Sequence, residues 1–163
     1  MSNQINADDV LLQAILLLRD TWGNPEVGIV AAAIVDPRFE PVFGVSLRTP
    51  SGRWLHAERN VLQKFENRYG LPDRNALMIT TLSPCTKVNS LSRAGEPCAQ
   101  LLMEKRLRRV HTGCIDLCAA PRGDIDYHPY GFELSLTDHP VCKRICDNLC
   151  GLFRSPNRAS NDV

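Results

Sequence analysis

The residues from Val27 to Val35 form an almost unbroken apolar run that is rich in β-branched side chains. A strand with one wet face alternates apolar and polar residues, whereas a strand that is apolar at nearly every position is covered on both faces. Asp36 and Pro37 end the run, and Val42 to Leu47 supplies its expected antiparallel partner. These runs therefore predict a sheet with helices packed on both of its sides.

The rest of the chain alternates between helical and strand patterns. Periodicity, cap residues and stop signals predict helices over about 8–22, 55–69, 97–107 and 141–153. Further strands are predicted at 76–82, 109–116 and 132–137. The predicted order is α-β-β-α-β-α-β-β-α, which is typical of a three-layer α/β/α fold around a mixed five-stranded sheet.

A length of 163 residues and a hydrophobic content of 44% allow one compact domain with a real core. We expect this single domain to cover residues 1–154, and residues 155–163 to be a flexible polar tail. The net charge is only +1, and the one basic run, Lys105 to Arg109, ends a predicted helix, where cations complement the helix dipole. The charge therefore favours a small substrate over a nucleic acid.

Two features set the expected compartment. Met1 to Val10 carries no basic residue, and Val10 to Leu18 is too short an apolar run to span a bilayer, so we expect neither a signal peptide nor membrane association. Seven cysteines in such a chain indicate free or metal-bound thiols rather than disulfides. We therefore expect a cytoplasmic protein.

Three short motifs carry the chemistry, namely His56-Ala57-Glu58, Pro84-Cys85 and Pro97-Cys98. One imidazole and two thiolates are good zinc ligands, and three protein ligands leave a fourth position for water. The predicted helix starts at His56 and Cys98 can aim these ligands at one point. Glu58 can then serve as base and as acid on water that the metal activates. The motifs therefore predict one Zn²⁺ per chain.

The substrate implied by such a site is a ring with an exocyclic amine on a carbon beside a ring nitrogen. Attack at that carbon releases ammonia and leaves a carbonyl. Cytosine-type rings fit this requirement directly, and adenine or guanine types also fit. We therefore expect the partner of the site to be a small aminated heterocycle.

On these motifs, together with Thr81 to Cys85 and the element order from about Val10 to Thr137, the chain resembles the cytidine deaminase superfamily. The resemblance implies His56, Cys85 and Cys98 as zinc ligands and Glu58 as the proton shuttle. It also implies that backbone groups near Ala57 and Leu82 hold the substrate edge, and that the protein is a homo-oligomer, either a dimer or a tetramer.

The spacing of the two cysteines departs from the superfamily signature. Two residues separate them in the standard signature, whereas the segment from Thr86 to Pro97 separates them here. The riboflavin-pathway members of the superfamily also lengthen this segment, by less, and end it with a Pro-Cys pair that is similar to Pro97-Cys98. The segment therefore marks where this chain differs from its better-known relatives.

The connection between the last two predicted strands carries information about the subclass. Leu117 to Gly131 is interrupted by two prolines and two glycines, which oppose a helix, and a parallel pair usually needs a helical crossover. We therefore expect strand 132–137 to run antiparallel to strand 109–116. Within the superfamily, that direction resembles the free cytidine deaminases and some bacterial deaminase toxins, rather than the deoxycytidylate, riboflavin-pathway and nucleic-acid-editing enzymes.

Five side chains are candidates for substrate contacts outside the motifs. Lys87 and Arg93 in the long segment could hold a phosphate or carboxylate, although a solvated surface loop explains them equally well. Arg48 ends the second strand, which in relatives reaches the substrate. Tyr127 and Tyr130 could stack on the ring or form a hydrophobic plug.

A second group of thiols invites a different interpretation. Cys142, Cys146 and Cys150 recur at helical spacing with His139 just before them, so they form either a second metal site or an apolar helix face. We favour the core or an oligomer interface, because cysteine packs well as a small hydrophobe. His111 alternates with Val110 on a predicted strand, so we expect it to be a packed histidine rather than a proton carrier.

The sequence therefore predicts a zinc-dependent hydrolytic deaminase of a small cytosine-like or other aminated heterocycle, with a nucleoside or nucleotide as substrate. One alternative is a deaminase of single-stranded DNA or RNA, which would use the basic run and the aromatics of residues 127–130 as a stacking track. A further alternative is an inactive, zinc-stabilised binding module.

Overall fold

In the computed structural model of the chain, residues 5–86, 97–115 and 130–153 are described. Within them, one mixed sheet has the strand order β3-β2-β1-β4-β5-β6. The pairs β1–β2, β1–β4 and β2–β3 are antiparallel, whereas β4–β5 and β5–β6 are parallel. The strands are β1 (Val27–Val35), β2 (Val42–Arg48), β3 (Trp54–Leu55), β4 (Leu77–Thr80), β5 (Arg109–Thr112) and β6 (Glu133–Leu136).

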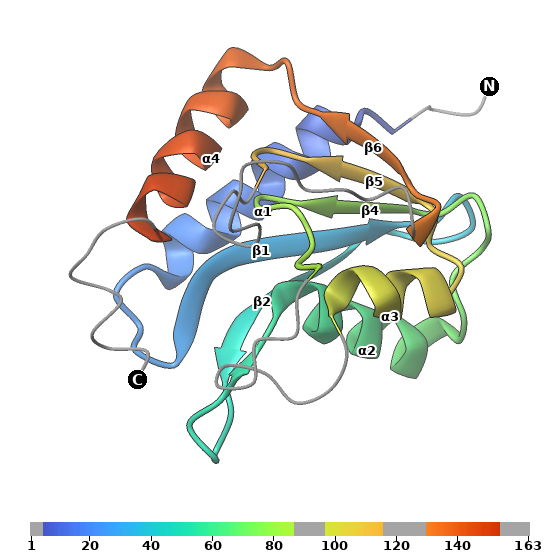
Figure 1. Cartoon of the computed structure of the whole chain (residues 1–163), viewed down its shortest axis with the longest axis horizontal. Helices are drawn as coiled ribbons and strands as arrows, with labels where there is room; N and C mark the ends of the chain where they lie inside the picture. Colours follow the sequence, from blue (N-terminus) through green and yellow to red (C-terminus); the bar gives the residue numbers. More distant parts are fainter. Residues whose placement is uncertain (1–4, 87–96, 116–129, 154–163) are drawn as a thin grey trace.

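Helices cover both faces of this sheet, as predicted. One layer holds α1 (Ala7–Thr21) and α4 (Pro140–Phe153), and the opposite layer holds α2 (Ala57–Tyr69) and α3 (Cys98–Glu104) (Figure 1). The three-layer α/β/α fold class is therefore confirmed. The sheet has six strands instead of five among the described residues, because the short strand β3 precedes α2 where the sequence predicted the helix start.

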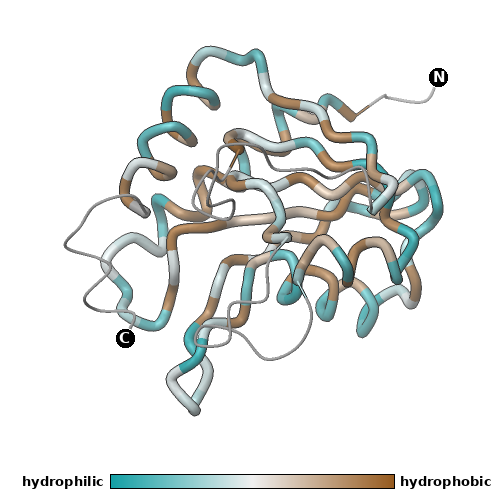
Figure 2. Tube along the Cα trace, in the orientation of Figure 1, coloured by the Kyte–Doolittle hydropathy of each residue, from teal (hydrophilic) through white to brown (hydrophobic). Residues whose placement is uncertain are grey.

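Alternate side chains of β1 enter the two cores, which explains its continuous apolar sequence. Ala32 and Ile34 pack in the cluster that contains Phe65 of α2, while Ala33 packs in the cluster that contains Leu11 of α1. All three of these β1 side chains are fully buried, and the hydrophobic trace of β1 runs through the middle of the molecule (Figure 2). Burial on two faces is what removes the alternation of an ordinary strand.

Helix α2 lies unusually close to β2, and this contact positions the first turn of the helix. A Cβ atom at Gly44 would lie only 2.9 Å from the backbone nitrogen of Val61, so no larger residue fits there without a shift. The buried side chain of Asn60 donates a hydrogen bond to the carbonyl of Val45 at 2.7 Å. The start of α2 is therefore tied to the sheet by sterics and by a buried polar contact.

The direction of the last strand corrects the sequence prediction. β6 pairs with β5 in parallel, with Val110 opposite Leu134 and His111 opposite Ser135. A parallel connection needs about a dozen residues but not necessarily a helix, and the chain between Thr112 and Glu133 satisfies that length. The prediction of an antiparallel pair was therefore wrong, and the resemblance to the free cytidine deaminases that rested on it is no longer supported.

The structure adds two details to the sequence predictions. The N-cap of α1 is Asn6 and not Asp8 or Asp9. The side chain of Asn6 accepts a hydrogen bond from the backbone amide of Asp8. No helix in the described part of the chain is long and apolar enough to cross a membrane. The predicted tail at 155–163 lies outside the described residues, so the single domain over 1–154 stays a prediction.

Candidate metal centre

Three side chains from separate parts of the chain converge where α2 and α3 begin. The Nδ1 atom of His56 lies 3.7 Å from Sγ of Cys85 and 3.4 Å from Sγ of Cys98. All three ligand atoms lie within 4.8 Å of one another. In the part of the chain that the structure describes, this is the one group of three or more His, Cys, Asp or Glu side chains close enough to share a metal ion.

Backbone contacts bring the widely spaced cysteines together. Cys98 is the first residue of α3, and its amide donates to Sγ of Cys85 at 3.3 Å. The amide of Ala99 donates to the carbonyl of Cys85 at 3.0 Å. On the other side, the amide of Ser83 donates to the carbonyl of Cys114 at 2.9 Å, which holds the Cys85 segment to the end of β5. The long connection therefore does not prevent the two thiols from facing the same point.

The separations between these atoms fit zinc. A tetrahedral ion with a Zn–S bond of about 2.3 Å and a Zn–N bond of about 2.0–2.1 Å places its nitrogen and sulfur ligands about 3.6 Å apart. The two distances from His56, 3.4 and 3.7 Å, lie on either side of that value. One imidazole and two thiolates also form the donor set that suits Zn²⁺, and a trio leaves one coordination position open.

The two thiols are coupled electrostatically. A hydrogen bond from Cys98, together with His56, lowers the pKa of the Cys85 thiol to about 4, although burial opposes the shift. The pKa of Cys98 is raised because its thiol is the donor to Cys85 and because it is buried. Cys85 is therefore a thiolate at neutral pH, which is the form that binds metal.

Glu58 lies in the first turn of α2, two residues after His56. Its side chain is buried, with 3% of the residue exposed. Burial raises the pKa of its carboxyl to about 7, although the nearby His56 opposes this shift. A carboxyl with that pKa can take up and release a proton near neutral pH, which is what a general acid and base requires.

The structure describes four of the seven predicted substrate contacts. Ala57 is fully buried at the start of α2, and the side chain of Leu82 packs in the core beside α1. The carbonyl of Leu82 accepts a hydrogen bond from the Thr80 hydroxyl at 2.6 Å. Arg48 is exposed at the end of β2, where its backbone pairs with Trp54.

The aromatic candidates have a mixed outcome. Tyr130 is half-buried, its ring stacks on Phe132, and its hydroxyl donates to the carbonyl of Thr86 at 3.2 Å. Lys87, Arg93 and Tyr127 lie outside the described residues. Asn60 was not among the predicted site residues, although its position beside Val61 and Leu62 on the inward face of a predicted helix was a signal.

The second group of thiols belongs to the core. Cys142, Cys146 and Cys150 are at most 2% exposed and pack with Val10 and Leu11 of α1. Burial raises the pKa of Cys146 to about 12, so it remains a neutral thiol. The core interpretation is therefore confirmed, and no second metal cluster is found within residues 5–86, 97–115 and 130–153.

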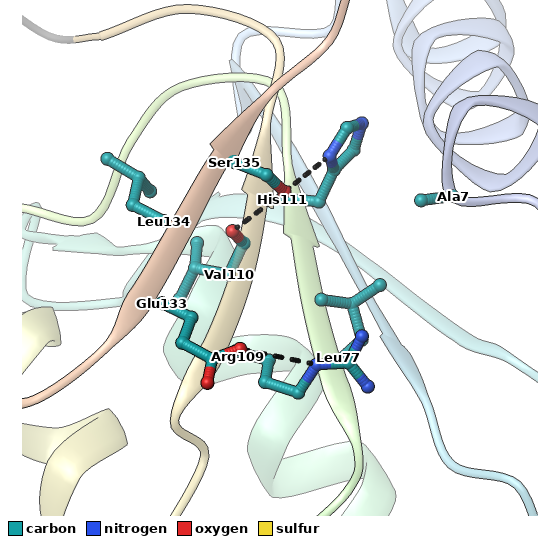
Figure 3. Close-up of a pocket in the computed structure, with 8 residues that line it drawn as sticks. All are labelled: Ala7, Leu77, Arg109, Val110, His111, Glu133, Leu134 and Ser135. Carbon is teal, nitrogen blue, oxygen red and sulfur yellow. Dashed lines mark hydrogen bonds and ion pairs between the residues drawn. The ribbon is translucent and has the colours of Figure 1, made fainter.

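His111 lines a groove of about 250 Å³ between β6 and the start of α1 (Figure 3). Its Nδ1 lies 2.9 Å from the Ser135 hydroxyl, and its Nε2 lies 2.9 Å from a carboxylate oxygen of Asp8. Arg109 and Glu133 in the same groove face each other at 4.0 Å. Ligand pockets usually enclose about 300–1,000 Å³, and the imidazole here is already bonded on both nitrogens. His111 is therefore a packed histidine, as predicted.

Comparison with known proteins agrees with this geometry. The diaminohydroxyphosphoribosylaminopyrimidine deaminase/5-amino-6-(5-phosphoribosylamino)uracil reductase from Thermotoga maritima is similar in structure, with a TM-score of 0.65 and 25% identity. The match covers 90% of this chain but only 40% of the Thermotoga protein. No curated protein matches the chain significantly.

Two further structures share the fold. One is dCMP deaminase from the cyanophage S-TIM5, with 20% identity, a TM-score of 0.57, and coverage of 84% of this chain and 100% of that chain. The other is Rib2 deaminase from Aspergillus oryzae, with 15% identity, a TM-score of 0.56, and coverage of 80% and 83%. A family model matches residues 5–114, which include all three cluster residues, and the chain therefore belongs to the family described as the cytidine and deoxycytidylate deaminase zinc-binding region.

Proposed function

We propose that the protein is a zinc-dependent hydrolytic deaminase of a small aminated heterocycle, with His56, Cys85 and Cys98 as the zinc ligands. The observation that carries this proposal is the buried Glu58 carboxyl, with its raised pKa, beside a trio whose spacing fits zinc. A purely structural site is usually closed by four protein ligands and needs no such carboxyl. The open trio with an adjacent acid supports a catalytic role.

The chemistry divides between the metal and the chain. A zinc ion held by this trio supplies a Lewis acid that lowers the pKa of water from about 16 towards about 7. Glu58 takes one proton from the attacking water and delivers it to the ring nitrogen, and it then takes the second proton from the hydroxyl formed on the ring carbon and delivers it to the amine, which leaves as ammonia. Its carboxyl pKa of about 7 suits both transfers, because it can hold the proton between them.

The proposed substrate is an aminopyrimidine nucleotide. The proteins of similar structure include a diaminohydroxyphosphoribosylaminopyrimidine deaminase and a dCMP deaminase, and the substrates in both names are such compounds. The parallel direction of β6 removes the argument for a free nucleoside, but it does not separate a nucleotide from a polymer, because the nucleic-acid-editing enzymes belong to the same branch. Lys87 or Arg93 would hold the phosphate, because both belong to the segment that starts at the metal ligand Cys85.

Two observations favour a small substrate over a polymer. The basic run is partly neutralised, because Lys105 pairs with Glu66 at 2.6 Å, and Leu107 within the run is fully buried. Tyr130, which a stacking track would need, has its ring on Phe132 and its hydroxyl on Thr86. These contacts leave less of the proposed track available to bases than the sequence suggested.

Ammonia release by the zinc-loaded protein tests the proposal. The panel should hold dCMP, CMP, the phosphoribosylated diaminopyrimidine, cytidine, cytosine, aminopurines and a cytosine-rich oligonucleotide. We expect turnover on at least one monomeric compound, with a phosphorylated pyrimidine preferred to its unphosphorylated form. Turnover of the oligonucleotide alone would reject the small-substrate proposal, and no turnover of any compound would favour the binding-module alternative.

A further inference from the structure

The chain just beyond Cys85 enters a connection that is longer than the one in the standard signature. When two residues separate the cysteines, the connection itself limits how far either thiol can move. Here the connection runs from Thr86 to Pro97. The amides of Cys98 and Ala99 bond to Cys85 itself, so a bond to Thr86 would add a separate point of attachment one residue later.

Tyr130 contacts the chain at this point. The residue stands shortly before β6, and its hydroxyl donates a hydrogen bond to the carbonyl of Thr86 at 3.2 Å. Its ring stacks on Phe132, with the ring centroids 5.9 Å apart and an angle of 25° between the planes. The polar end of the tyrosine therefore reaches the residue after Cys85, while its apolar body lies on Phe132.

Phe132 connects this contact to the second thiol. It packs against the core cluster that contains Leu102 of α3, the helix whose first residue is Cys98. Tyr130 and Phe132 together thus link the residue after Cys85 to the core cluster that includes Leu102 of α3. A tyrosine suits this role because it combines a large packing surface with a hydroxyl that can bond to a backbone group.

We propose that Tyr130 is a positioning residue of the metal centre, which stabilises the chain after Cys85 in place of a short connection between the cysteines. This inference rests on the proposed ligand trio, and it replaces the sequence-based role of Tyr130 as a ring that stacks on substrate. Partners that orient metal ligands without touching the metal commonly influence affinity. The bond is to a backbone carbonyl, so the side chain at position 86 is not required for it.

The test is the rate at which the zinc-loaded protein releases zinc to a chromogenic chelator, with the thiolate charge-transfer spectrum of the Co²⁺ form as a second readout. Tyr130→Phe removes only the hydroxyl, and we expect release to be roughly threefold to tenfold faster, as for the loss of one hydrogen bond. The Co²⁺ spectrum should change as well. Thr86→Ala keeps the carbonyl and should release zinc at the wild-type rate.

Tyr69→Phe is the matched control, because Tyr69 is also half-buried and stacks on Phe39, with ring centroids 4.2 Å apart. Wild-type zinc release and an unchanged spectrum in Tyr130→Phe would overturn the positioning role while leaving the proposed deaminase intact. Equal acceleration in Tyr69→Phe would also overturn it, because it would indicate general loosening. A wild-type protein that holds no zinc would reject the proposed function itself.

Discussion

Two clusters of side chains in this molecule each combine a histidine with a carboxylate, yet they differ in their electrostatics. In the cluster near α1, Asp8 accepts hydrogen bonds from His111 and Thr137. Burial raises the pKa of Asp8, but these bonds outweigh it and the pKa is lowered. In the metal centre, burial dominates and the pKa of Glu58 rises to about 7.

The comparison separates structural from functional polar groups. A partly buried carboxylate that accepts hydrogen bonds, as Asp8 does, stays charged and ties elements together. A buried carboxyl whose pKa is shifted towards neutrality costs stability and is retained where it can move a proton. Asp8 and Glu58 are both carboxylates near a histidine, yet the hydrogen bonds to Asp8 indicate a structural role and the burial of Glu58 indicates a functional one.

The largest expected effect concerns the proton carrier. Glu58→Gln should keep its full complement of zinc but lose turnover by about 10²- to 10⁴-fold, because the amide cannot accept and return the proton. Steady-state kinetics and metal analysis of the same sample check both statements. Glu133→Gln is the control, since its side chain is 86% exposed. A near-normal rate in Glu58→Gln would refute the mechanism.

The same comparison applies to the thiols of the two regions. Cys98→Ser should lose zinc, and activity with it, because the hydroxyl is a far weaker ligand than a thiolate. Cys142→Ser makes the identical change in the core beside α1 and should keep its zinc while unfolding more easily. Zinc analysis after dialysis measures the difference. Full occupancy in Cys98→Ser would mean that another thiol supplies the third ligand.

A smaller effect is expected in the structural cluster. Asp8→Ala leaves the buried His111 and Thr137 without this acceptor and should lower the free energy of unfolding by about 1–3 kcal/mol. The zinc content should not change. Asp9→Ala removes the neighbouring carboxylate, which is exposed, and serves as the control in urea titrations. Zinc loss in Asp8→Ala with an intact fold would contradict the division between the clusters.

The smallest effect extends the comparison to acid pH. Hydrogen bonds from Arg38, opposed by burial, lower the pKa of Asp36 from 3.8 to about 2. A carboxyl with a depressed folded-state pKa stabilises the protein above its unfolded pKa, and that stability is lost as the pH falls through about 4 to about 2. Asp36→Asn should therefore be less stable than the wild type by about 1–2 kcal/mol at pH 6.

Urea titrations of both proteins between pH 6 and pH 2 measure this difference. It should shrink on acidification, because the wild-type carboxyl becomes protonated and loses its advantage over the amide. A difference that stayed constant across this range would show that Asp36 acts through packing rather than through its charge.

The parts of the fold that were predictable have strong local signals. The bounds of β1 match the predicted 27–35 because a strand that is covered on two faces has an apolar residue at nearly every position. β3 was missed because Trp54 and Leu55 are too few to show any periodicity. The predicted direction of β6 was wrong because the prolines and glycines of the connection were taken as evidence against a crossover. The length of the connection was the relevant property.

The candidate site follows the same division. His56, Glu58 and Cys85 could be assigned from motifs, and Cys98 meets them because α3 begins there. The contacts of Tyr130 with Thr86 and of Asn60 with Val45 join residues far apart in the sequence, so no local pattern reveals them. The roles of Lys87, Arg93 and Tyr127 stay predictions.

The long connection between the two cysteines also affects the entropy of loop closure. Closing a flexible loop becomes costlier with length, by about 0.6 kcal/mol for each doubling. In this protein the loop is already closed by the bonds from the amides of Cys98 and Ala99 to Cys85. The entropic cost of closing the loop is therefore borne by the folding of the chain rather than by metal binding, so a longer segment need not weaken the affinity for metal.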